Sequence, residues 1–133
     1  MYKFIDFKLH KDNRGYLVPI ENNKDIPFQI KRIYYIWGSD FNMMRGCHAH
    51  YKLKEVLIPI VGNCIFKLDD GENVEQIFLS DPTKGLYIPP YTWLEFTHFS
   101  KDCVLLALTD DYYNDFDYIR DYNLFKKEIV KHD

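Results

Sequence analysis

The chain of 133 residues lacks the features of several common protein classes. Its three cysteines, Cys47, Cys64 and Cys103, are odd in number and contain no C-x-x-C pair, which argues against a disulfide framework or a structural zinc site. No apolar run approaches the length of a membrane span, and the N-terminus has no signal-peptide stretch. The net charge of −3 gives no general attraction for nucleic acid. We therefore expect a cytoplasmic protein that binds neither membrane nor nucleic acid, and in which a few placed arginines would hold any phosphate.

The composition is that of a folded protein rich in aromatic residues. Hydrophobic residues make up 47% and charged residues 28% of the chain, which argues against disorder. Aromatic residues reach 17%, with 11 Tyr and 10 Phe, and such residues favour strands and the walls of ligand sites. The length suits one domain over residues 1–133 with one core.

Most of the sequence reads as short strands separated by turns. Asp12-Asn-Arg-Gly15 and Asp69-Asp-Gly71 are typical turn sequences, and Pro89-Pro90 forms a rigid corner. About ten close-spaced strands indicate an antiparallel sandwich or barrel. The expected strands are 4–9, 16–20, 30–37, 45–50, 55–60, 63–68, 74–79, 85–88, 93–99 and 103–108.

The C-terminal segment has a different periodicity. Tyr118, Tyr122, Phe125 and Ile129 recur at i, i+4, i+7 and i+11, which places them on one face of a helix. The pattern predicts a helix over about 119–131 that packs on the outside of the barrel or on a second subunit.

The segment Arg45-Gly-Cys-His48-Ala-His50 carries the strongest chemical signal. Side chains two residues apart on a strand share a face, so His48 and His50 are expected to point the same way. An imidazole titrates close to neutrality and can both take and return a proton. Arg45 is positioned to stabilise negative charge on an enolate oxygen. The alternatives are two structural histidines and a surface salt bridge of Arg45.

The spacing around the histidines resembles the first sequence motif of the cupin superfamily. His-x-His is followed after four residues by Glu55 and after six more by Gly62. The resemblance implies an all-β fold, a cupin or jelly-roll barrel, here with a C-terminal helix. In metal-binding cupins a third His follows a Pro-rich turn, but Leu94 occupies that place here. An aliphatic side chain is no metal ligand, so we expect an enzyme without a metal or another cofactor.

From about residue 4 to about residue 128 the chain is similar to the dTDP-4-oxo-6-deoxyglucose 3,4-oxoisomerases, also called sugar 3,4-ketoisomerases. The similarity rests on the order and spacing of several motifs. Two departures are Glu55, where Gln is usual in this family, and Leu94, where His is common. The matching motifs are Asp-x-Arg-Gly at 12–15, Ile-x-Arg-x-Tyr-Tyr-Ile at 30–36, Arg-Gly-x-His-Ala-His at 45–50, Asp-Asp-Gly at 69–71, Gly-Leu-Tyr at 85–87, Trp93, and Asp111-Tyr-Tyr with Asp117-Tyr-Ile-Arg120.

The resemblance implies a reaction and a role for each candidate residue. The family converts a 4-keto sugar on a nucleotide into its 3-keto isomer through an enediol. By this resemblance His48 is the base that acts on carbon, and His50 moves protons between the two oxygens. Tyr35 matches a pocket-facing position in related epimerases, where its phenol would meet a sugar oxygen. A core position for Tyr35 is the alternative.

Two further arginines are candidate substrate ligands. Arg14 matches the arginine that holds the diphosphate in this family, a task suited to its rigid fork of donors. Arg120 is expected to act similarly or to pair with Asp117 or Asp121.

The resemblance also implies partners. Such cupins form homodimers, often by exchanging an N-terminal strand. The keto product would pass to a pyridoxal-phosphate-dependent aminotransferase that makes an amino sugar for surface polysaccharide. A cofactor-free nucleotide-sugar epimerase and a sugar-binding cupin without activity remain the alternative functions.

Overall fold

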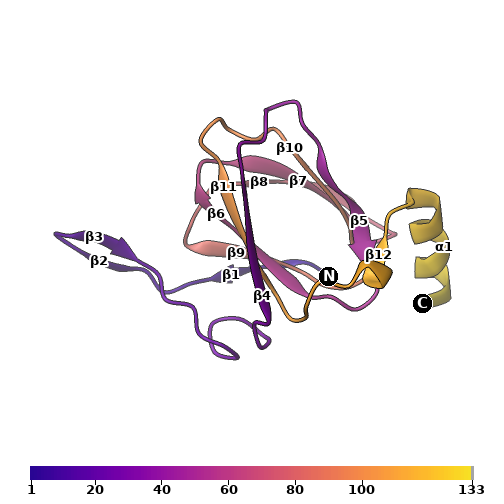
Figure 1. Cartoon of the computed structure of the whole chain (residues 1–133), viewed down its shortest axis with the longest axis horizontal. Coiled ribbons are helices and arrows are strands. Elements are labelled where there is room, and N and C mark those ends of the chain that lie inside the picture. The colour runs from indigo at the N-terminus through magenta and orange to yellow at the C-terminus, as the bar shows by residue number, and fades with distance from the viewer. Residues whose placement is uncertain (133) are drawn as a thin grey trace.

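The computed structural model describes residues 1–132, and strands form most of it (Figure 1). Two five-stranded antiparallel sheets face each other and enclose a barrel. The predicted all-β barrel with a C-terminal helix is confirmed. The first sheet has the order β1 (Lys3–Asp6), β9 (Lys84–Ile88), β6 (Glu55–Val61), β11 (Val104–Thr109) and β4 (Arg32–Trp37). The second has the order β12 (Tyr118–Ile119), β5 (Arg45–His50), β10 (Trp93–Thr97), β7 (Cys64–Asp69) and β8 (Val74–Leu79).

A third, two-stranded sheet lies apart from the barrel. The strands β2 (His10–Asp12) and β3 (Gly15–Leu17) pair across the predicted turn and form a hairpin that projects from the barrel (Figure 1). The expected strand 4–9 ends early, at Asp6, and the next residue, Phe7, is buried in an apolar cluster with Val56 and Ile58. The amide of Phe7 donates to Thr83 O at 2.8 Å.

The main core fills the space between the two sheets. Alternate residues of each strand supply it, as the period of two requires, and burial of such apolar side chains is the main stabilising contribution. Its fully buried members include Leu57, Phe66, Leu86, Leu94 and Leu105.

A second apolar layer covers part of the outer face of the first sheet. Val56 and Ile58 of β6 point outward there and are buried under Ile26 and Phe28 of the segment before β4. The outward side chains of the edge strand β4 stay uncovered. These are Ile33, Tyr35 and Trp37, each more than half exposed.

The C-terminal helix begins later than the periodicity predicts. A 3₁₀ turn at Asp115–Asp117 leads into β12, and α1 runs from Tyr122 to His132. Residues 119–121 were expected in the helix, but Ile119 pairs with Ala49 of β5, and Asp121 accepts the amide of Leu124 as a helix cap. Phe125 and Ile129 then pack on the outer face of the second sheet with Trp93 and Ala49, so the expected packing outside the barrel is confirmed. Within residues 1–132, no helix has the length and apolar character that crossing a membrane requires.

Candidate active site

A bulge in β5 sets the direction of the two histidines. Leu94 of β10 lies opposite His48, and the next residue, Glu95, lies opposite Gly46, so Cys47 is the extra residue. Gly46 and Cys47 have φ angles of +80° and +58°. A Cβ on Gly46 would lie 2.6 Å from Phe96 Cε1, so the bulge needs glycine at that position.

The histidines point into the barrel, on one face as predicted. Their ring centroids are 4.9 Å apart, and His50 is 6% exposed. On the other face of β5, Cys47 and Ala49 pack toward Phe125 and Ile129 of α1. The helix therefore supports the strand from behind while the imidazoles face the interior.

Hydrogen bonds fix the tautomer of both imidazoles. Nδ1 of His48 lies 3.0 Å from Gly46 O, and Nδ1 of His50 lies 3.1 Å from Asp117 Oδ2. A carbonyl or carboxylate oxygen only accepts, so each Nδ1 carries the hydrogen and each Nε2 keeps a free lone pair. Both rings are thereby prepared to take a proton at Nε2.

Asp117 also shapes the loop that follows β5. Its Oδ1 accepts the amide of Lys52 at 2.9 Å, and its Oδ2 accepts the amide of Leu53 at 3.1 Å. One carboxylate therefore holds this loop and the ring of His50 together. From the sequence, Asp117 was expected to pair with Arg120, whereas Arg120 pairs with Asp115 at 3.2 Å.

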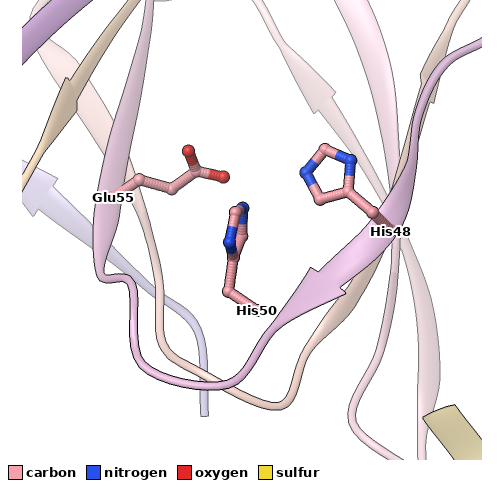
Figure 2. A group of neighbouring side chains, drawn as sticks. All are labelled: His48, His50 and Glu55. Carbon is pink, nitrogen blue, oxygen red and sulfur yellow. The ribbon is translucent and has the colours of Figure 1, made fainter. Parts of the chain in front are cut away.

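Glu55 faces the histidines from the opposite sheet (Figure 2). It is 2% exposed and accepts a hydrogen bond from the phenol of Tyr34 at 3.2 Å. Donor or acceptor atoms of His48, His50 and Glu55 all lie within 4.8 Å of one another. Three titratable groups thus converge on one point inside the barrel.

Burial disfavours the charged form of all three groups, so it lowers the pKa values of the two histidines and raises that of Glu55. Desolvation, together with the neighbouring His50, lowers the pKa of His48 to about 4. Desolvation, followed by the charges of Arg120 and Arg32, lowers the pKa of His50 to about 4. Desolvation raises the pKa of Glu55 to about 7, against the opposing effects of Tyr34 and Arg32. At neutral pH both imidazoles are therefore uncharged bases.

Cationic and aromatic side chains surround the pair. The ring of Tyr118 lies 4.9 Å from that of His48 and 4.3 Å from that of His50. The guanidinium of Arg120 lies 4.0 Å from the centre of the Tyr118 ring. A cavity of about 200 Å³ reaches His50 and is lined by Arg32, Lys52 and Tyr118, among others. The same cavity is also lined by Asp110, Asp111 and Asp117, so charges of both signs and aromatic surface border the interior site.

The prediction that Tyr35 faces the pocket is wrong. Tyr35 is 60% exposed on the outer face and stacks on Trp37, with ring centroids 5.7 Å apart. Its neighbour Tyr34 occupies the inward position and bonds to Glu55. An error of one residue reverses the face of a strand residue. Arg32, two residues before Tyr34, shares the inward face and was missed as well, although both belong to the motif at 30–36.

The structure brings one of the three candidate arginines, Arg120, to the histidines. Arg45 begins β5 at an exposed position. Arg14 lies in the β2–β3 turn, is highly exposed and pairs with Asp12. The hairpin projects from the side of the barrel away from β5, so Arg14 does not reach the histidines of its own chain.

Leu94 limits the suitability of the site for a metal ion. His48, His50 and Glu55 have donor types that a metal accepts. Leu94, at the place of a further ligand, lies directly opposite His48 and is part of the main core.

A family model described as FdtA: WxcM-like, C-terminal, matches residues 1–130. The chain belongs to this family. A curated relative from Aneurinibacillus thermoaerophilus, TDP-4-oxo-6-deoxy-alpha-D-glucose-3,4-oxoisomerase, is 50% identical over 129 residues, which are 97% of this chain and 93% of the relative. The family resemblance inferred from the motifs is confirmed.

Solved structures of sugar 3,4-ketoisomerases have the same fold as this chain. The sugar 3,4-ketoisomerase QdtA from Thermoanaerobacterium thermosaccharolyticum, in complex with TDP, is 44% identical with a TM-score of 0.96, over 98% of this chain and 96% of that one. A mutant of QdtA in which asparagine replaces one histidine has been solved in complex with TDP-4-keto-6-deoxyglucose. The epimerase RmlC from Legionella pneumophila, 17% identical with a TM-score of 0.74 over 89% of this chain and 71% of that one, shares the fold alone. The predicted cupin barrel is confirmed.

Proposed function

We propose that the protein isomerises TDP-4-keto-6-deoxyglucose to a TDP-3-keto-6-deoxyhexose, as a single domain without a metal or another cofactor. The observation that carries the proposal is the pair of uncharged imidazoles whose tautomers both leave Nε2 free inside the barrel. Relatives named as 3,4-oxoisomerase and 3,4-ketoisomerase, one in complex with TDP, support the choice of substrate.

The reaction requires proton transfers and no net change in oxidation state. The C4 carbonyl acidifies the proton on C3, and a base removes it to form an enediol. Protonation of C4 and loss of the proton from the C3 hydroxyl then place the carbonyl at C3. We assign His48 Nε2 to the carbon atoms and His50 Nε2 to the transfer of protons between the oxygens.

The cations beside the pair suit the charged parts of the substrate and intermediate. Arg32 lines the same cavity as His50, Arg120 lies over the ring of Tyr118 that packs against His50, and both charges lower the pKa of this imidazole. Their guanidinium groups would stabilise the enediolate oxygen or hold the diphosphate through paired hydrogen bonds. Arg45 remains a candidate ligand for the more distant part of the nucleotide.

Arg14 fits a role in a homodimer. It is carried on a projecting hairpin, and Tyr16 and Leu17 of the same hairpin are exposed at 71% and 60%. The uncovered face of β4, formed by Ile33, Tyr35 and Trp37, adds apolar surface suited to a second copy of the chain. In such a dimer, Arg14 would hold the diphosphate at the site of the partner. Light scattering of the purified protein should give a dimer mass, and Trp37→Glu should shift it toward the monomer.

The product suggests a reaction partner and a location. A 3-keto sugar is the substrate that a pyridoxal-phosphate-dependent aminotransferase needs to install an amine at C3. Nucleotide sugars are made and used in the cytoplasm, so we place the protein there.

Incubation with TDP-4-keto-6-deoxyglucose in deuterated water tests the proposed function. Nuclear magnetic resonance of the sugar should show a 3-keto product with deuterium at the exchanged carbon, and the couplings should report the gluco or galacto configuration at C4. An unchanged 4-ketone with inverted stereocentres would indicate an epimerase instead. Tight binding without any exchange or turnover would indicate a binding protein.

A further inference from the structure

Neither imidazole carries a proton that it can donate to O4 when the isomerisation begins. Each neutral ring keeps its single hydrogen on Nδ1, where Gly46 O and Asp117 hold it. Negative charge develops on O4 as C3 loses its proton, and His50 can pass a proton to O4 only after its Nε2 has taken one from the C3 hydroxyl. A group that already carries a proton would stabilise O4 at this first step.

Glu55 is the group that meets this need. Its carboxyl is buried and lies within 4.8 Å of ring nitrogens of both histidines. Two Nε2 lone pairs and a carboxylate are all acceptors, so their convergence is favourable only if a proton is shared among them. Tyr34 donates to one carboxyl oxygen, Oε2, so the other oxygen can carry the proton.

We propose that Glu55 is the acid of the site, an inference that rests on the proposed isomerase function. As His48 Nε2 takes the proton from C3, the C3–C4 double bond forms and the carbonyl electron pair moves to O4. O4 then takes the proton of the Glu55 carboxyl, directly or through His50. In the second half, C4 takes a proton from His48, and the C3 hydroxyl returns one to the Glu55 carboxylate. Every proton is balanced, and no oxidant or reductant is needed.

The surroundings of Glu55 favour its protonated form near neutrality. Its pKa is raised to about 7 because desolvation outweighs the opposing hydrogen bond from Tyr34 and the charge of Arg32, both on β4. From β5 it faces His48 and His50, which are neutral at this pH. From β12 it faces the phenol of Tyr118, whose pKa is raised. Its register partners on β9 and β11 are Ile88 and Thr109, which carry no charge.

The pH dependence of kcat tests the proposal. For an acid with a pKa of about 7, the protonated fraction falls roughly 30-fold between pH 6 and pH 8.5, and wild-type kcat should fall with it. Glu55→Gln can donate a hydrogen bond to O4 but cannot transfer a proton. We expect this variant to have a lower kcat at pH 6 and values within about twofold of each other at the two pH values. Glu55→Asp, which keeps a titratable group, should retain the decline.

A matched control and a second measurement complete the test. Glu72→Gln, on the exposed β7–β8 turn, should keep the wild-type profile. Infrared difference spectroscopy should show a protonated carboxyl at pH 6 in the wild type that is missing in Glu55→Gln, and this readout does not depend on turnover. A wild-type kcat that stays flat from pH 6 to 8.5, or the same decline in Glu55→Gln, would overturn the role of Glu55. Absence of isomerase activity in the wild type at every pH would instead overturn the proposed function.

Discussion

Replacement of Asp117 by Asn is the most informative single change outside the converging groups. The carboxylate accepts from Nδ1 of His50 and from the amides of Lys52 and Leu53. An Asn side chain has one oxygen in place of two. In either orientation at least one of these N–H groups therefore faces an NH₂ group and loses its acceptor.

The hydrogen bonds of Asp117 indicate how much the substitution should change the free energy of unfolding and kcat. A partly buried donor without an acceptor costs about 1–3 kcal/mol, so the free energy of unfolding should fall by about that amount. When His50 takes a proton, the negative charge of Asp117 stabilises the resulting imidazolium. A hydrogen bond to a charged partner is stronger than one to a neutral partner by about 1–2 kcal/mol. The loss corresponds to roughly a 5- to 30-fold lower kcat.

Two assays separate these effects. Urea denaturation at pH 7 gives the free energy of unfolding, and product formation from TDP-4-keto-6-deoxyglucose at saturating substrate gives kcat. Asp40→Asn, an exposed change in the loop between β4 and β5, is the matched control and should leave both unchanged. A kcat within twofold of the wild type in Asp117→Asn, with an unchanged urea midpoint, would refute the role given to this carboxylate.

Four other measurements address separate parts of the structure. His48→Asn should abolish the incorporation of solvent deuterium at the sugar, and full exchange would remove His48 as the base on carbon. Gly46→Ala should lower the free energy of unfolding by more than about 2 kcal/mol, because its Cβ would lie 2.6 Å from Phe96 Cε1 and the residue has φ +80°; an unchanged urea midpoint would contradict this. Burial raises the pKa of Glu55 from 4.5 to about 7, so the group's contribution to stability is present below pH 4.5 and is lost as the pH rises through 7. Measured by urea denaturation, the free energy of unfolding of the wild type should therefore fall by up to roughly 3 kcal/mol relative to that of Glu55→Gln between pH 4.5 and pH values above 7. If the free energies of unfolding of the two proteins change with pH in parallel, the pKa of Glu55 is not shifted. Treatment with EDTA should leave kcat unchanged within twofold, and a loss that zinc or iron restores would show a metal requirement.

Local patterns in the sequence were sufficient for most strands of the barrel and for the shared face of His48 and His50, but they missed β2 and β12. The period of two is a property of the extended backbone, and it survives the bulge at Cys47 because that residue is added before the pair. The same rule failed for Tyr35. Tyr34 and Tyr35 are both aromatic and adjacent, so the sequence gives no sign of which of them faces inward. Pairing of β4 with β11 at the edge of the sheet determines the face.

The C-terminal helix shows a similar limit of periodicity. Tyr118 fits the helical spacing with Tyr122, Phe125 and Ile129, yet its backbone pairs with His50 and its ring packs against both histidines. A tertiary backbone pairing therefore outweighed the local helical pattern. The signal that could have marked the boundary is Asp121, a good helix cap three residues before Leu124.

By itself, the sequence determined the all-β barrel, the terminal helix, the family and the histidine pair, because these depend on short-range spacing that the backbone converts directly into geometry. Only the tertiary structure placed Glu55 across the barrel from His48 and His50 and brought Asp117 to the back of His50. It also separated Arg14 from the site of its own chain. Those relations join residues far apart along the chain, and they depend on how the two sheets close around a dry interior, where burial shifts the pKa values on which the proposed chemistry relies.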